Sequence, residues 1–201
     1  MKITHLLSIV ALLWAIAACQ SDREATQTPA PVMSSIYKDN GTASGPSTIQ
    51  PDLAGARAAA ATSAQQQEVL SYINQARSKS CQCGTTTYPA VPALTLDAQL
   101  NAASDKYAVD LATYNYFSHT GRDGSQPWDR MTREGYLWRA AGENIAAGYS
   151  TARAVVDGWL KSPGHCSNIM SPNFKNVGVG YGYSASGTYK YYWVTDFGTK
   201  R

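Results

Sequence analysis

The stretch Asn176–Tyr183, NVGVGYGY, decides the fold class, because glycines at every second position alternate with Val and Tyr. A period of two is typical of a β-strand. After the turn residues SASG at 184–187, the run TYKYYWVTDFG at 188–198 predicts a second strand. The end of the chain therefore forms a β-hairpin or two neighbouring antiparallel strands. Because a glycine face lets another backbone approach closely, we expect a helix to pack on it.

Upstream of this hairpin the period becomes helical. Residues 63–80 repeat apolar side chains on one face and predict a helix with Ser63 as its cap and Gln66 as the capping-box partner. Residues 95–117 predict a longer helix that ends just before His119, because their apolar side chains recur at three- and four-residue steps.

Three shorter helices are expected between this long helix and the hairpin. They cover residues 125–136, with Ser125 as a cap, residues 150–162, and a brief segment from Pro163 that places His165 near a helix N-terminus. Residues 81–94 predict a loop, because they contain one Gly and two Pro. Residues 139–149, RAAGENIAAGY, are rich in small residues around Glu143, and their pattern assigns no element.

The amino terminus predicts export. Residues 1–18 combine one Lys with an apolar core too short to span a bilayer comfortably, which is typical of a signal peptide. IAAC at 16–19 matches a lipoprotein signal, in which Cys19 is acylated and becomes the first residue. Gln20 then favours the outer membrane if the cell is Gram-negative. The alternative is ordinary signal-peptidase cleavage after AIA, which leaves Cys19 as a free or paired thiol.

Two regions follow the signal peptide. Residues 19–62 are rich in Ser, Thr, Ala, Pro and Gly and predict a flexible tether, because such a segment buries too little apolar surface to order itself. Residues 63–201 have the length and the apolar content of one domain.

The overall charge disfavours nucleic acid as a partner. The net charge is +3, of which Lys2 leaves with the signal peptide, and no Lys/Arg cluster is present. The chain also lacks the H-E-x-x-H, G-x-S-x-G and P-loop motifs. His165 and Cys166 are not a catalytic dyad, because adjacent residues of a helix point in different directions.

Five stretches, in the same order as in the family, resemble the CAP superfamily of cysteine-rich secretory, antigen 5 and pathogenesis-related proteins. They are NYFSHTGRDG, AGENIAAG, VVDGWLKSPGHCSNIM, NVGVGYGY and YYWVTDFG. The chain looks like a bacterial secreted member. The resemblance implies an α+β fold, an α-β-α sandwich with a three- or four-stranded antiparallel sheet between helical layers, and a cleft that gathers histidines and acids.

By position, the resemblance assigns His119, Glu143 and His165 to this cleft. A second acid is missing, because Ser162 and Pro163 occupy the two places where relatives carry Glu. Two imidazoles and a carboxylate suit an open zinc site. The same three side chains also suit a hydrogen-bonded structural cluster, and the sequence leaves both interpretations open.

The resemblance also pairs Cys83 with Cys166 in a disulfide, which leaves Cys81 as an odd thiol. Exported proteins permit such bonds. An alternative is a structural zinc held by the three cysteines and His165, although C-x-C spacing fits it poorly.

Two functions follow from these features. The first is a non-catalytic binding module of the cell envelope that takes a lipid, a peptide or a partner protein, with a divalent metal as a candidate occupant of the cleft. The second is a metal-assisted hydrolase of the cell surface, with Glu143 as the base and the histidines as ligands.

Overall fold

A computed structural model of the chain describes residues 32–38 and 60–201. Residues 1–18, Cys19 and most of the predicted tether lie outside the described residues. The helices are α1 (Ser63–Arg77), α2 (Ala98–Tyr114), α3 (Pro127–Arg133), α4 (Ala152–Lys161) and α5 (Pro163–Ile169). The strands are β1 (Val32–Lys38), β2 (Cys81–Cys83), β3 (Thr86–Tyr88), β4 (Thr95–Leu96), β5 (Trp138–Ala147), β6 (Asn176–Tyr183) and β7 (Tyr191–Lys200).

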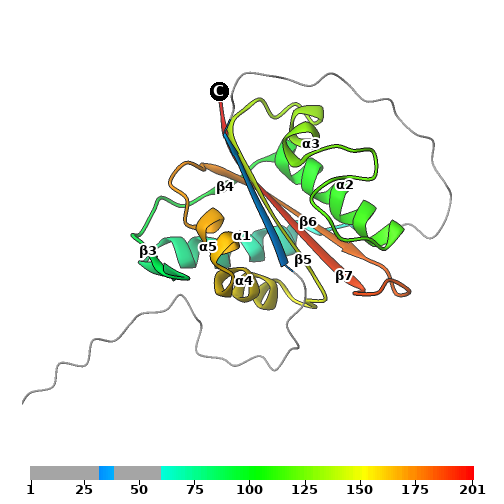
Figure 1. Cartoon of the computed structure of the whole chain (residues 1–201), viewed down its shortest axis with the longest axis horizontal. Helices are drawn as coiled ribbons and strands as arrows, with labels where there is room; N and C mark the ends of the chain where they lie inside the picture. The colour runs from blue at the N-terminus through cyan, green and yellow to red at the C-terminus, as the bar shows by residue number, and fades with distance from the viewer. Residues whose placement is uncertain (1–31, 39–59) are drawn as a thin grey trace, which may run out of the picture.

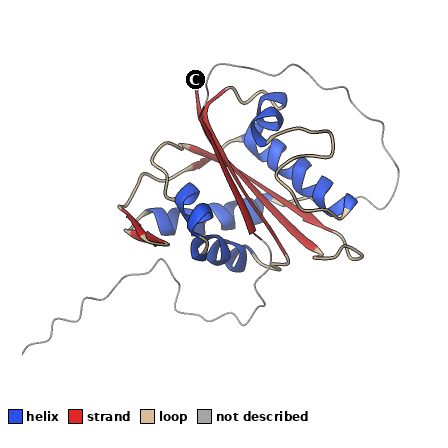
Figure 2. Cartoon of the chain, in the orientation of Figure 1, coloured by secondary structure: helices blue, strands red, loops and turns tan. Residues whose placement is uncertain are grey.

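One sheet, in the order β1-β5-β7-β6-β4, lies between two groups of helices. Helices α2 and α3 cover one face, and α1, α4 and α5 cover the other (Figure 1). Coloured by type, the strands of this sheet form one layer between these helices, and the two-stranded sheet of β2 and β3 lies apart from it (Figure 2). This arrangement confirms the predicted α-β-α sandwich.

The sheet is larger than expected. The predicted antiparallel strands are present as β5, β7 and β6, but β4 adds a two-residue parallel pairing to β6, and β1 pairs antiparallel with β5. Strand β1 belongs to the segment predicted as a flexible tether, so that interpretation is wrong for Val32–Lys38. Composition missed this strand because its backbone pairs with a strand more than a hundred residues away in the sequence.

The glycine-rich stretch behaves as predicted. Strands β6 and β7 are an antiparallel pair, and α2 packs on the glycine face of β6. A Cβ atom on Gly178 would lie 2.1 Å from the carbonyl carbon of Leu100, and one on Gly180 would lie 2.1 Å from the carbonyl oxygen of Ser104. The glycines therefore set the distance between the helix and the sheet.

Local boundaries differ from the sequence expectations. Thr62, rather than Ser63, caps α1, with Gln65 as its capping-box partner. Gln126, rather than Ser125, precedes α3, and its N–H donates to Asp129 Oδ2. The predicted loop at 81–94 contains the short hairpin β2–β3, whose turn begins at Gly84 with a φ of 62°. A positive φ at this turn suits glycine, which the loop prediction used only as a helix breaker.

Among the described residues, no helix has both the length and the hydropathy needed to span a bilayer. Arg77, in the last turn of α1, is buried and donates to the carbonyl oxygens of Pro92, Ile169, Ser171 and Phe174. Desolvation lowers the pKa of Arg77 to about 10. This guanidinium joins α1 to the end of α5, so the helical layer that carries His165 is held firmly.

Candidate functional site

His119 and Glu143 meet on the face of the sheet covered by α2 and α3. His119 lies in the loop between these helices, and its Nδ1 is 2.5 Å from Glu143 Oε1. Glu143 points from β5 into the protein and is fully buried. Its other oxygen, Oε2, accepts a hydrogen bond of 2.7 Å from Arg130 Nη2. Both oxygens of this carboxylate are therefore engaged.

Arg130, on α3, is the centre of the contacts around Glu143. Its guanidinium also donates to the carbonyl oxygens of Ser125 and His119, and its Cζ lies 3.4 Å from the centroid of the Tyr107 ring. Desolvation by burial is the largest single influence on Arg130 and lowers its pKa, but the surrounding acidic groups, Glu143 first among them, together outweigh it and raise the pKa. Arg130 is thus a buried permanent cation paired with a buried carboxylate.

Asp196, on β7, lies directly across from Glu143 in the antiparallel pairing. It is fully buried, and its Oδ2 accepts a hydrogen bond of 2.9 Å from Ser104 Oγ. Desolvation, followed by the negative charge of Glu143, raises the pKa of Asp196 well above its ordinary value. A protonated Asp196 has an O–H group that can donate a hydrogen bond. Among the described residues, its Oδ1 has no hydrogen-bond partner.

Sequence reasoning missed Arg130 and Asp196. A second acid was sought at positions 162 and 163, beside His165, and the acid that lies opposite Glu143 is in the last strand. The available signal was a charged residue inside the apolar run YYWVTDFG, since buried carboxylates in such runs need a partner. That partner is the Ser104 hydroxyl, and the strand register places Asp196 opposite Glu143.

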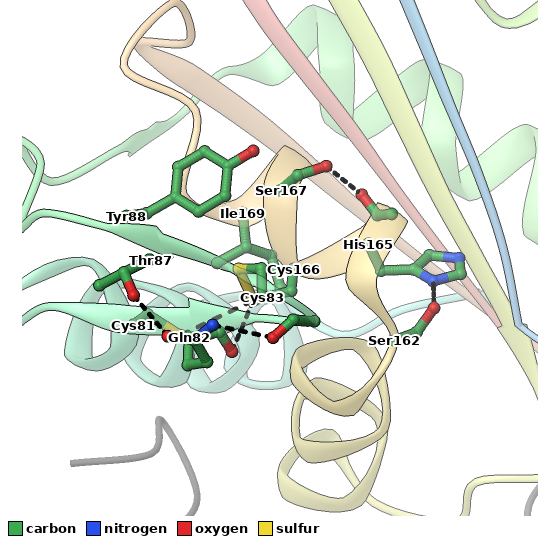
Figure 3. Close-up of a disulfide and its surroundings, with 12 residues drawn as sticks. Cys81, Gln82, Cys83, Thr87, Tyr88, Ser162, His165, Cys166, Ser167 and Ile169 are labelled. Atoms are coloured by element: carbon green, nitrogen blue, oxygen red, sulfur yellow. Dashed lines mark hydrogen bonds between the residues drawn. A yellow bond between two sulfur atoms is a disulfide. The ribbon is translucent and has the colours of Figure 1, made fainter. Parts of the chain in front are cut away.

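His165 lies on α5, on the other side of the sheet. Its Nδ1 is 2.7 Å from Ser162 Oγ (Figure 3). Asn144, the residue after Glu143, donates to the His165 carbonyl oxygen. Because neighbouring residues of a strand point to opposite faces, Glu143 faces α3 while Asn144 faces α5. The structure therefore joins His119 directly to Glu143, and it places His165 on α5 with Ser162 as a hydrogen-bond partner.

Among the described residues, the donor atoms of His119, Glu143 and His165 do not all lie within 4.8 Å of one another. In residues 32–38 and 60–201, the one group of potential ligands whose donor atoms all lie within 4.8 Å of one another is Cys81, Cys83 and Cys166. The Arg130 guanidinium on Glu143 opposes a second cation at that carboxylate. The hydrogen-bonded alternative describes His119 and Glu143 better.

The cysteine cluster holds the predicted disulfide. Cys83 and Cys166 are bonded, with their Cα atoms 5.4 Å apart, and join the β2–β3 hairpin to α5 (Figure 3). A zinc site built from all three cysteines is excluded, because two of the thiolates are consumed by this bond. The Sγ of Cys81 lies 3.7 Å from that of Cys166. No cysteine of the described part is a free thiol, so the expectation of an odd thiol at Cys81 is wrong.

Comparisons with known proteins agree with this architecture. Residues 70–197 match the model of the cysteine-rich secretory protein family, CAP. The Bacillus subtilis protein YkwD is 32% identical over 169 residues, which are 82% of this chain and 62% of YkwD. The chain thus spans less than two thirds of that relative. The B. subtilis membrane protein YlbC is 37% identical over 75 residues, or 37% of this chain and 21% of YlbC.

Two solved structures are also similar. An extracellular protein with an SCP domain from Bacillus anthracis superposes with a TM-score of 0.56 and 29% identity, over 68% of this chain and 41% of that one. An outer surface protein of Borrelia burgdorferi superposes with a TM-score of 0.51 and 22% identity, over 55% of this chain and 80% of that one. The second similarity is one of fold.

Proposed function

Because the chain belongs to the cysteine-rich secretory protein family, we propose that it is an exported, envelope-held module that acts by binding and not by catalysis. Its ligand would be a lipid, a peptide or a partner protein. The observation that carries this proposal is the burial of Glu143 between His119 and Arg130.

A hydrolase needs a base that reaches a substrate or water proton within hydrogen-bonding distance. Glu143 is the acid that the hydrolase hypothesis assigns to this role, yet both of its oxygens are engaged and none of its surface is exposed. Asp196 is equally buried. These contacts favour a structural role for the acidic pair and leave the hydrolase hypothesis without an accessible base.

Export and anchoring rest on different observations. The similar B. anthracis protein is described as extracellular. The signal-like residues 1–18 and the IAAC sequence support acylation of Cys19, with the outer membrane as the destination in a Gram-negative cell.

One observation favours metal binding as a second candidate function. His119 Nε2 is buried and has no hydrogen-bond partner among the described residues. A buried imidazole nitrogen without a partner is a candidate metal ligand. Zinc binding at His119, Glu143 and His165 would require Arg130 to leave Glu143 and His165 to approach from the other face.

Calorimetric titration of the mature chain with Zn²⁺ separates the two candidates. We expect no saturable binding at neutral pH, and the same result for the His119→Ala and His165→Ala variants, each checked for folding by circular dichroism. One-to-one binding would overturn the structural interpretation if it were lost in both variants and also about one unit below the imidazole pKa of roughly 6.5.

A further inference from the structure

Strand β1 is set apart from the rest of the domain. Residues 39–62 separate it from α1, and it lies outside residues 70–197, which match the family. It nevertheless forms the outermost strand of the sheet, beside β5 (Figure 1). Seven residue pairs, from Val32 opposite Ala146 to Lys38 opposite Ala140, join the two strands in antiparallel register.

The edge of β5 is suited to accept a strand. Residues 141–147 of β5 are all buried with β1 in place, and a long strand at the edge of a sheet pairs readily with an extended chain. At the other edge of the sheet, β4 pairs only with the first two residues of β6. Side chains occupy the backbone beyond them: Asn101 and Asp105 accept from the N–H groups of Val179 and Tyr181, and Gln66 donates to the Val179 carbonyl oxygen. The sheet thus presents one extended site for backbone hydrogen bonds.

Strand β5 does not depend on β1 for its position. Nine residue pairs join β5 to β7 on its inner side, and α3 packs against β5. Helix α5 contacts both β5 and β1, so it flanks the strand that occupies the edge. This arrangement resembles a preformed groove with a bound peptide, in which backbone hydrogen bonds supply the affinity.

We propose that the outer edge of β5 is a binding site for an extended peptide, filled in this chain by its own Val32–Lys38 as an exchangeable strand. The peptide binds antiparallel to β5, opposite Ala140–Ala146. This inference assigns the peptide class to the binding module proposed above. It requires neither export, nor acylation, nor metal, so the two proposals fail in different experiments.

Because β1 is covalently attached, it competes with any added peptide for the edge of β5. A covalent connection gives an attached ligand an effective concentration on the order of 1 mM. If the free strand binds with a Kd on the order of 0.1 mM, the attached copy weakens binding of an added peptide about tenfold. An added peptide should therefore bind well only where the attached strand is prevented from docking.

The test uses the mature chain and a fluorescent peptide with the sequence of residues 32–38. Ser34→Pro with Ser35→Pro blocks β1, because proline cannot donate to the ladder and one of any two neighbouring amides in an antiparallel strand points at the partner strand. Ser44→Pro with Ser47→Pro is the matched control outside β1. By anisotropy, we expect the blocked variant to bind the peptide about tenfold more tightly than the control variant and the wild type do.

Backbone methylation identifies the binding mode. Alternate amides of an antiparallel strand point toward the partner strand, so methylating one alternate set of the peptide's amides should abolish binding, whereas methylating the other set should not. Equal effects of the two sets would overturn strand pairing. Equal binding of the peptide to the blocked and control variants would overturn the proposal.

A second variant keeps the proposal testable if the double-proline variant does not fold. Here residues 32–38 are replaced by a Gly/Ser segment of equal length, and folding is followed by circular dichroism. If this variant and the proline variant both unfold while the control stays folded, β1 is an obligatory strand and the proposal is wrong. If either one folds, its peptide affinity decides.

Discussion

At the scale of single residues, the cluster of Asp196, Glu143 and Arg130 buries two carboxyl groups beside one positive charge. The guanidinium offsets one carboxylate, and the raised pKa of Asp196 keeps the second one neutral over a wider pH range. Two charged carboxylates beside a single cation would leave one buried charge unpaired, which is costly. Ser104 then supplies a hydrogen-bond donor to Asp196.

This balance predicts an unusual pH dependence for Asp196. A carboxyl group whose pKa is raised by folding binds more protons in the folded state, so the free energy of unfolding falls as pH rises from about 3.9 toward the raised pKa. Asp196→Asn keeps an acceptor for Ser104 and does not ionise. We expect this variant to be more stable than the wild type at neutral pH, with the loss between acid and neutral pH reduced.

Urea unfolding midpoints measured across that pH range check the prediction. Asp157→Asn is the control, because Asp157 forms a partly exposed pair with Arg153 within one helix, and such pairs contribute about 0.5 kcal/mol or less. The same pH slope in Asp196→Asn and the wild type would show that Asp196 does not titrate in this way.

Whether the sequence predicts one of these contacts depends on whether a local motif or the long-range packing of the chain creates it. His119 and Glu143 were predicted to lie together, because the family resemblance fixes each by a local motif. Arg130 and Asp196 were not, because their roles arise from strand register and from how α3 packs on β5. His165 was placed near a helix N-terminus correctly, yet no local motif indicates that the sheet separates it from Glu143.

At the scale of elements, the contact between α2 and β6 depends on the absence of side chains. Gly180→Ala would place a Cβ atom 2.1 Å from the Ser104 carbonyl oxygen, which belongs to helix backbone and cannot rotate away. We expect a loss of about 3 kcal/mol in unfolding free energy, since the helix must move away from the sheet. Thermal and urea unfolding measure the loss.

Gly187→Ala provides the comparison, because its Cβ atom would lie 3.3 Å from the nearest atom, the Ser184 Cβ. Its cost should be below about 1 kcal/mol. Similar losses in the two variants would mean that α2 does not rest on the glycine face.

The Cys83–Cys166 disulfide joins elements separated by 83 residues in the sequence. Closing a loop of this length restricts the unfolded chain, which corresponds to about 4 kcal/mol of stability on the loop-entropy model. Replacing both cysteines by Ala removes the bond without creating a thiol that could react with Cys81. Urea unfolding of the folded double variant should show a loss approaching this figure, and an unchanged midpoint would contradict it.

Elements with a clear period were predicted well, and those without one were missed. The helices and the β6–β7 pair have periods set by the side chains that they bury. Strand β5 has no such pattern, because small residues on both of its faces leave little contrast in residues 139–149. Helix caps moved by one residue, since neighbouring Thr and Ser are equally good cap residues.

At the scale of the whole molecule, the docking of β1 changes how the domain is held. If Cys19 is the anchored residue, docking leaves residues 20–31 between the lipid and the sheet, and undocking leaves residues 20–62. At about 3.5 Å per extended residue, these segments span at most about 40 Å and about 150 Å. The domain would therefore lie close to the membrane when β1 is docked and could move farther from it when β1 is undocked.

Two measurements test this arrangement in a cell envelope or in vesicles. Cys19→Ser should release the chain from the membrane fraction, whereas detection of an unmodified amino-terminal peptide beginning at Ala18 or Cys19 in that fraction would contradict acylation.

With the acylated chain in vesicles, energy transfer between a dye at the C-terminus and a dye among the lipid headgroups reports the distance of the domain from the membrane. Ser34→Pro with Ser35→Pro should lower this transfer relative to the Ser44→Pro and Ser47→Pro control, because only the first variant frees β1. Equal transfer in both would mean that β1 does not limit the reach, and the domain would then be held at a distance set by something other than strand pairing.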